Sequence, residues 1–381
     1  MGLLDYYRQF EGMTEEEVNQ GLREQAAERR RKALTRVDTL DLSLTTWPEL
    51  PHPRIAGAIT FVARRGLHRY PHLASTDLRA RLAERHGVDP ERLILGNGAA
   101  ELLTAATRAV IEPGQRLLTR WPSYPLYPIM ARRAHGQAVR VDGGHDGGVD
   151  ALLEAAAREP DVRAVAIAAP NDPTGELLAA SELQRLLEQL PEGVAVLLDE
   201  SLVEFVDAQP INSSIDLLER YPRLLVFRSF SKAWGLAGLR IGYAIGGPGS
   251  QELLAELAPD LGVSELSQAG ALEALRGCTE LVERRVRVVC EERPLLIAAL
   301  RRRGFEVADS QANFVWAAHP TIPAADLAAR LEQTGVLVAA GDALGEPGHI
   351  RMTVPARAYA KRVLDAVDKA LARRADLAEQ G

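Results

Sequence analysis

The stretch RLLVFRSFSKAWGLAGLRIGYAIG, residues 223–246, contains the pattern that decides the fold. A short apolar run at 223–227 leads into a polar loop with several glycines, and a second apolar run covers 240–246. Further apolar runs come earlier in the chain, with helical patterns between them, at 92–95, 115–119, 163–169 and 195–199. Short apolar runs that alternate with helices predict an α/β fold built on a mostly parallel sheet.

The helical patterns carry boundary signals of their own. Residues 77–87 end at Gly87, and glycine is a common helix stop. The helix predicted at 181–190 begins with Ser181 and Gln184, which have the spacing of a capping box. These signals support helices on the surface of the predicted sheet.

We predict three parts in the chain. Residues 1–44 form an N-terminal arm, whose charged helix at 14–34 has few apolar positions and is expected to lie on another surface, such as a second subunit. Residues 45–262 form a large α/β domain. Residues 263–381 form a smaller α+β domain, because the order of its elements changes.

The smaller domain begins with a long helix rich in Arg and Glu, predicted over 272–303, which Pro294 is expected to kink or split. Short strands and two more helices are predicted to follow. The strands are expected at 305–310, 313–318, 335–340 and 349–354, and the helices at 324–334 and 358–375.

Composition excludes several classes of protein. The chain has 381 residues, and 46% hydrophobic and 25% charged residues are ordinary for a soluble globular protein. Acidic residues outnumber basic ones, 52 to 45, which disfavours a nucleic-acid binder. Two cysteines exclude a disulfide framework and a multi-thiolate metal site, so no metal is expected. With no signal peptide and no apolar run near the ~20 residues of a membrane helix, we expect a cytoplasmic protein without membrane contacts.

Polar or glycine-rich segments follow the predicted strands. In an open α/β sheet, ligands bind beyond the carboxyl ends of the strands, so these segments are expected to converge on one pocket. They are GNGAAELL (96–103), RWPSYPLY (120–127), PNDPTG (170–175), DESLVEF (199–205) and RSFSKAWGLAGLR (228–240).

Lys232 is the first candidate for chemistry. A lone loop lysine is usually a solvated charge, but here Ser229, Ser231 and Arg240 provide phosphate donors around the amine. This grouping suits a lysine that forms a Schiff base with an aldehyde bearing a phosphate.

Three other segments fit such a ligand, and each has a plainer alternative. Asp199 ends an apolar strand, where a carboxylate needs a cation such as a pyridinium nitrogen, although a salt bridge or a helix cap would also serve. GNGAAELL could hold a phosphate at a helix start, or be an ordinary strand–helix turn, because Glu101 breaks the G-x-G-x-x-G pattern. Tyr124 could stack on a ring or pack in the core.

Taken together, these segments resemble the class I/II aminotransferases of fold type I, which depend on pyridoxal 5′-phosphate. The histidinol-phosphate aminotransferase-like group, which also includes threonine-phosphate decarboxylases, is the most similar branch. The resemblance covers about residues 68–355 and rests on GNGAAELL, PNDPTG, DES and SFSKAWGLAGLRIGY in that order.

The resemblance implies a role for each matching residue. Lys232 would form the Schiff base and then shuttle a proton, and Asp199 would keep the pyridine nitrogen protonated. It also implies a homodimer, an amino acid and a 2-oxo acid as substrates, and a set of binding residues. The phosphate would be held by the backbone of Gly98, Ala99 and Ala100 and by the side chains of Ser229, Ser231 and Arg240. Tyr124 would stack on the ring, and Tyr70 would reach the phosphate in the neighbouring subunit. Arg351 would grip the substrate α-carboxylate, and Asn313 would lie close to the substrate.

Two departures affect the cofactor's phenolate oxygen. The family has Asn before Pro-Thr-Gly as a donor to this oxygen, but here the residue is Asp172, and an ionised carboxylate cannot donate. Either Asn171 takes over, or Asp172 is protonated or turned away. The family's second donor is a tyrosine, and here Leu202 replaces it. We therefore expect the Schiff base to hold its proton to higher pH than in typical members.

Another departure concerns the substrate. Histidinol-phosphate enzymes have an extra arginine where this chain has Ala339 or Ala340, and the N-terminal segment reads DLSLTTWPE instead of the usual L-N-x-N-E. A dianionic phosphate needs charge-assisted partners, so histidinol phosphate is disfavoured as the substrate. The glycine-rich segment 341–351 is compatible with a neutral or apolar side chain.

Three other functions compete with an aminotransferase. A decarboxylase of the threonine-phosphate type would use the same cofactor. A nicotinamide-dependent dehydrogenase would need the complete glycine motif and an acidic residue about 20 positions further on. A non-enzymatic cofactor-binding protein would not need Lys232, Asp199 and Arg351 together.

Overall fold

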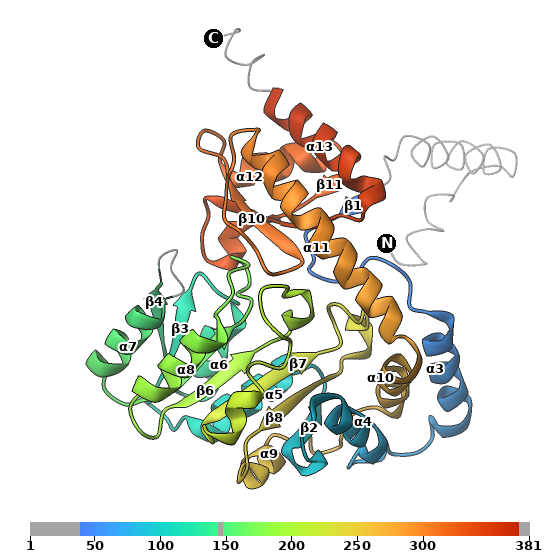
Figure 1. The fold of residues 1–381 in the computed structure, drawn as a ribbon, viewed down its shortest axis with the longest axis vertical. Coiled ribbons are helices and arrows are strands. Elements are labelled where there is room, and N and C mark those ends of the chain that lie inside the picture. The colour runs from blue at the N-terminus through green and yellow to red at the C-terminus, as the bar shows by residue number, and fades with distance from the viewer. Residues whose placement is uncertain (1–38, 144–147, 373–381) are drawn as a thin grey trace, which may run out of the picture.

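The computed structural model describes residues 39–143 and 148–372. The helix predicted at 14–34 lies outside the described residues. The larger part is a seven-stranded sheet with the order β2-β8-β7-β6-β5-β3-β4, in which only β8 runs antiparallel to its neighbours (Figure 1). The strands are β2 (Leu93–Gly96), β3 (Arg116–Trp121), β4 (Gln137–Asp142), β5 (Val162–Ala168), β6 (Ala195–Asp199), β7 (Leu224–Ser229) and β8 (Gly242–Gly246).

The predicted α/β fold is confirmed, and each apolar run forms a strand. The runs read as continuously apolar because helices cover both faces of the sheet. In β5, for example, Ala164 and Ala166 belong to one core cluster and Val165 and Ile167 to the other. The first face is covered by α5 (Ala99–Val110), α6 (Leu126–Arg133) and α9 (Gln251–Glu256), and the second by α4 (Thr76–His86), α7 (Val149–Arg158), α8 (Ala180–Gln189) and α10 (Glu265–Gly277).

A smaller antiparallel sheet with the order β12-β13-β10-β9 lies beyond the carboxyl edge of the large one (Figure 1). Its strands are β9 (Glu306–Val307), β10 (Phe314–Ala318), β12 (Ala339–Ala340) and β13 (His349–Thr353). Helices α11 (Thr279–Arg301), α12 (Ala324–Glu332) and α13 (Arg357–Ala372) pack around it. The division at residues 44/45 and 262/263 stays a prediction.

The start of the described chain joins this smaller part. Strand β1 (Leu40–Asp41) pairs in parallel with β11 (Val336–Leu337). The chain then crosses to α3 (Pro53–Gly66), which packs on α10. The segment 43–52 therefore runs between the two sheets, past the carboxyl ends of the parallel strands (Figure 1).

Two helix predictions need correction. The helix predicted at 272–303 is two helices, but the break falls at Cys278, and Pro294 lies inside α11. The capping box predicted from Ser181 is wrong, because α8 begins one residue earlier. The side chain of Gln209 accepts the hydrogen bond of the Ala180 N–H instead, at 3.0 Å.

Within residues 39–143 and 148–372, no helix combines the length and the apolar character needed to cross a membrane.

Candidate active site

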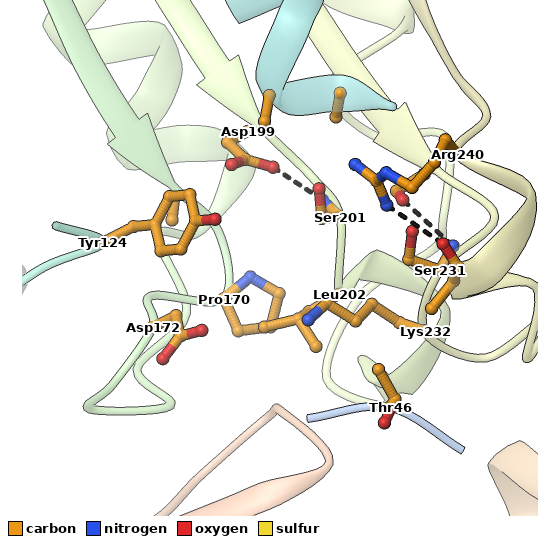
Figure 2. A pocket seen from close by; sticks show the side chains of 15 residues that line it. Thr46, Tyr124, Pro170, Asp172, Asp199, Ser201, Leu202, Ser231, Lys232 and Arg240 are labelled. Carbon is orange, nitrogen blue, oxygen red and sulfur yellow. Dashed lines mark hydrogen bonds between the residues drawn. The ribbon is translucent and has the colours of Figure 1, made fainter. Parts of the chain in front are cut away.

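A cavity opens where the parallel strands end, and it is lined by the loops that follow β5, β6 and β7 together with the first turn of α5 (Figure 2). The structure thus brings together most of the segments singled out in the sequence. The lining residues are Thr46, Ala99, Ala100, Tyr124, Ala168, Pro170, Asp172, Asp199, Ser201, Leu202, Ser229, Ser231, Lys232, Ala237 and Arg240.

The side chain of Lys232 crosses the floor of this cavity (Figure 2). Burial lowers the pKa of its amine below the usual value, and the carboxylate of Asp172 opposes that shift. The Nζ atom donates a hydrogen bond to Oγ1 of Thr45. A buried amine with a lowered pKa is more often unprotonated, which is the form that attacks an aldehyde.

Asp199 is the last residue of β6, and its carboxylate is buried at the opposite side of the cavity. Oδ1 accepts from the backbone N–H of Ser201 at 3.0 Å, and Oδ2 accepts from the hydroxyl of Tyr127 at 3.2 Å. Burial is the main cause that raises the pKa of Asp199. No salt bridge to Asp199 occurs within the described ranges, so a cationic ligand atom would stabilise the ionised form.

Tyr127 is a functional candidate that the sequence reasoning missed. It is fully buried in α6, and burial raises its pKa well above the usual value, so its hydroxyl remains a donor to Asp199. Tyr124 lies beside it with a ring-centroid distance of 5.8 Å in an edge-on arrangement, and its own ring borders the cavity. The only available signal was that both tyrosines belong to one segment following a predicted strand.

A cradle for an anion forms at the start of α5. Gly98 precedes the helix with φ of +93°, and a Cβ atom at this position would lie 2.5 Å from Nη2 of Arg240. The side chains of Ser229, Ser231 and Arg240 line the same side of the cavity. A helix N-terminus and a guanidinium group together favour a phosphate, and glycine is required there by both conformation and space.

The residues that the family resemblance assigns to the phenolate oxygen would not supply the usual donors. Asn171 is buried, and its side chain is committed to Pro122 O at 3.0 Å, Thr174 Oγ1 at 2.9 Å and Ser123 Oγ at 2.7 Å. It is not among the cavity-lining residues and its amide nitrogen is already engaged, so the role of Asn171 as a donor to the phenolate stays a prediction. Asp172 lines the cavity but forms an ion pair with Arg351, and Leu202 lines it with an apolar side chain.

Arg351 and Asn313 are not among the described cavity-lining residues, and both bind the segment 43–46. Arg351 Nη2 donates to Ser43 O at 3.1 Å, and Asn313 Nδ2 donates to Thr45 O at 3.0 Å. The contribution of this segment was missed, although the DLSLTTWPE stretch was recognised as unusual. Tyr70 is 83% exposed and does not line the cavity, so its role toward a neighbouring subunit stays a prediction.

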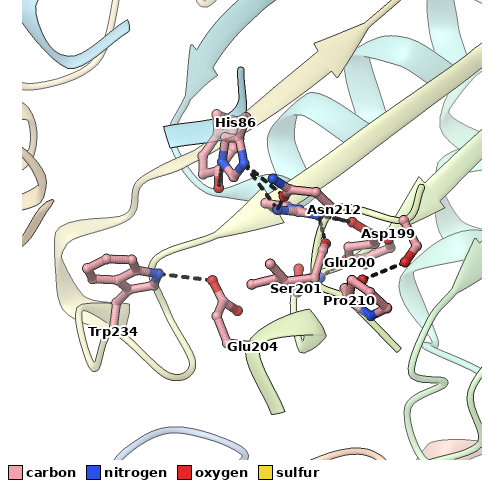
Figure 3. A network of polar contacts seen from close by, with 12 residues as sticks. His86, Asp199, Glu200, Ser201, Glu204, Pro210, Asn212 and Trp234 are labelled. Carbon is pink, nitrogen blue, oxygen red and sulfur yellow. Dashed lines mark hydrogen bonds and ion pairs between the residues drawn. The ribbon is translucent and has the colours of Figure 1, made fainter. Parts of the chain in front are cut away.

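A buried polar network lies behind Asp199 and stabilises the turn that carries it (Figure 3). The guanidinium of Arg228 pairs with Glu200 at 2.8 Å and donates to Asn212 Oδ1 at 3.2 Å. His86 contacts the Tyr243 hydroxyl at 2.9 Å, and burial lowers the His86 pKa to about 3. His86 is therefore neutral at physiological pH, and the one full ion pair of this network is that of Arg228 with Glu200.

The cavity fits pyridoxal 5′-phosphate on chemical grounds. It offers an amine for the aldehyde, a carboxylate for the ring nitrogen and a glycine–arginine cradle for the phosphate. A tyrosine ring is available to stack on the pyridine.

Comparison with known proteins gives consistent results. Residues 38–369 match the family model described as aminotransferase class I and II. The chain is 35% identical over 298 residues to an aromatic amino acid aminotransferase of Streptomyces avermitilis, which covers 76% of this chain and 81% of the relative. It is 39% identical over 253 residues to histidinol-phosphate aminotransferase 2 of Ralstonia nicotianae, which covers 66% of each.

A solved structure is also similar. The histidinol-phosphate aminotransferase of Sinorhizobium meliloti, in complex with pyridoxal-5′-phosphate, superposes with a TM-score of 0.78 at 25% identity. The superposition covers 92% of this chain and 94% of the other.

We expect Gly98→Ala to weaken the binding of pyridoxal 5′-phosphate about tenfold or more, because the new Cβ would displace Arg240. Gly114→Ala is the matched control, since Gly114 has φ of +88° and open space around its Cβ position. Both variants should lose stability in thermal unfolding, but only the first should lose affinity in a cofactor titration. Equal affinities for the two variants would contradict the cradle.

We also expect the lysine–cofactor Schiff base to keep its proton to a pH above neutral. Leu202 cannot donate to the phenolate, so the imine proton remains its main partner, and the nearby Asp172 carboxylate acts in the same direction. The visible absorption of the bound cofactor, titrated with pH, measures the midpoint. Leu202→Tyr should lower the midpoint, and a wild-type midpoint near or below neutral would refute the expectation.

Proposed function

The chain belongs to the class I and II aminotransferases, and from that premise we propose that its amino donor is an amino acid with an uncharged, aromatic side chain. The protein is a transferase that depends on pyridoxal 5′-phosphate and moves an amino group between an amino acid and a 2-oxo acid. The proposal concerns which amino acid it takes and which residues do the work.

The bound cofactor supplies an aldehyde and an electron-withdrawing ring. Lys232 is proposed as the amine that anchors the cofactor and then carries a proton to and from the substrate's Cα. Its lowered pKa suits a group that must be free of its proton in each cycle. Asp199, oriented by Tyr127 and Ser201, is proposed to hold a proton on the ring nitrogen.

The distribution of charge carries the proposal for the substrate. Arg240 and Lys232 are the two cationic side chains among the cavity-lining residues, and both serve the cofactor. The backbone position paired with Arg351 on the neighbouring strand is Ala339, which brings no charge. A phosphate-bearing substrate would therefore lack a charge-assisted partner near Arg351 and Ala339. The cavity-lining residues Leu202 and Pro170 suit an apolar group instead.

The surface around α3 supports a homodimer as part of the proposal. Several large apolar side chains are exposed there, which is unusual for a monomer. They are Phe61 (62% exposed), Leu67 (72%), Tyr70 (83%), Leu73 (62%) and Leu261 (67%). Tyr70 lies within this patch, as a residue that acts in a second subunit would. A cytoplasmic location stays a prediction.

The substrate proposal is tested by comparing amino donors. We expect kcat/KM for L-phenylalanine or L-tyrosine to exceed that for L-histidinol phosphate by about tenfold or more, since each unpaired phosphate contact costs on the order of 1–3 kcal/mol. Single-turnover absorbance changes of the cofactor give these values without a choice of acceptor. A preference for histidinol phosphate would contradict the proposal.

The dimer is tested at Tyr70. We expect sedimentation to show two chains per particle, and Tyr70→Phe to weaken cofactor binding about tenfold through loss of one hydrogen bond to a charged group. Tyr359→Phe removes the hydroxyl of another exposed tyrosine, 46% exposed on α13, and should have no effect. A fully active monomer, or equal affinities in both variants, would refute this role.

A further inference from the structure

The ion pair between Asp172 and Arg351 has no use in the transfer reaction described above. Arg351 Nη1 donates to Asp172 Oδ1, Nη2 donates to Ser43 O at 3.1 Å, and the guanidinium carbon lies 5.4 Å from the centroid of the Phe314 ring. Asp172 is 8% exposed and Arg351 is 9% exposed. Both outer nitrogens of the arginine are thus engaged within the protein.

The aspartate lines the cavity and occupies the arginine. Asp172 is one of the residues that line the cavity, whereas Arg351 is not among the described lining residues. Nη1 of Arg351, one of the two outer nitrogens that could grip a substrate carboxylate, is already paired with a carboxylate of the protein.

The loop that carries Asp172 is held from both sides. Asn171 is fixed by three side-chain hydrogen bonds, as described above. Gln311 N donates to Gly175 O at 2.7 Å, and a Cβ atom on Gly175 would lie 2.2 Å from Ser310 Oγ. The backbone of this loop is thus packed against the smaller sheet, and Asp172 is presented to Arg351 from a fixed position.

Charge limits what can enter. The groups that act on Lys232 in this cavity are the carboxylates of Asp172 and Asp199 and the guanidinium groups of Arg351 and Arg240. An incoming α-carboxylate would be a third anion, and the end-on fork of Arg351 is already engaged, Nη1 by Asp172 and Nη2 by Ser43 O. Only Nε of this guanidinium is without a hydrogen-bond partner in the described chain. End-on bidentate binding, which makes such pairs strong, therefore requires Asp172 to move. The substrate must either displace Asp172 or bind without the full arginine fork.

We propose that Asp172 determines specificity as a built-in competitor: it occupies Arg351, lowers the affinity for α-carboxylates, and so reduces the preference for amino acids over amines that lack this group. The proposal rests on the proposed function, because it concerns the same cavity. It applies to donor and acceptor equally, since the 2-oxo acid must reach the same arginine.

The direct test measures binding to the cofactor-loaded enzyme by calorimetry, with two probes that do not react. 3-Phenylpropionate carries the carboxylate, and 3-phenylpropionamide is its neutral match. We expect Asp172→Asn to bind the carboxylate about tenfold more tightly and the amide within about threefold of wild type, because the variant removes the charge and keeps the shape. If that variant does not fold, Asp172→Ser removes the same charge.

The matched control is Glu176→Gln in the same loop. Glu176 forms its ion pair with Arg120 and does not line the cavity, so neither probe should change. An Asp172→Asn variant that binds the carboxylate no more tightly, or that tightens both probes alike, would overturn the proposal.

A second measurement separates this proposal from the proposed function. L-Phenylalanine and 2-phenylethylamine differ only by the α-carboxylate, and each is tested in a single turnover. Failure of wild type and variant to convert L-phenylalanine would count against the aromatic donor, whatever the probes show. The proposal expects the ratio of kcat/KM for L-phenylalanine to kcat/KM for 2-phenylethylamine to rise about tenfold in Asp172→Asn. If L-phenylalanine is converted but this ratio does not rise, the result would count against the role of Asp172 alone.

Discussion

The structure depends on the burial of an amine and a carboxylate at the carboxyl edge of the sheet. Asp199 ends β6 and pairs in register with Phe227 of β7, whose following loop carries Lys232. The two adjacent strands therefore bring the groups to the same edge of the sheet. Burial removes both groups from water, which lowers the pKa of Lys232 and raises that of Asp199. A ligand with an aldehyde and a basic ring nitrogen relieves both costs, and pyridoxal 5′-phosphate has both.

Much of the large sheet could be predicted from the sequence, because its central strands are buried on both faces. Strand β4, QAVRVD at the sheet edge, was not predicted, since only Val141 in it is buried and its apolar signal is weak. The helix cap assigned to Ser181 failed because a side chain 29 residues away, that of Gln209, satisfies the backbone instead. Pro294 lies within a continuous helix whose buried residues, such as Leu296 and Ile297, hold it against the smaller sheet.

The site was predictable where it follows the strands and unpredictable where it depends on distant partners. Asp199 ends one apolar run, Arg240 begins another, and Lys232 lies in the loop between two runs, so their convergence follows from topology. The pair of Asp172 with Arg351 joins residues 179 positions apart and two different sheets, and no local pattern indicates it. The contact of Lys232 with Thr45 spans 187 positions.

The central claim is that Lys232 forms the covalent bond to the cofactor. The most direct measurement is reduction of the cofactor-loaded protein with borohydride, followed by mass spectrometry of its peptides. The account predicts that Lys232 is the one modified residue. The Lys232→Ala variant should still bind the cofactor but form no stable adduct. A reduced adduct on Lys32, Lys361 or Lys369, or none at any lysine, would contradict it.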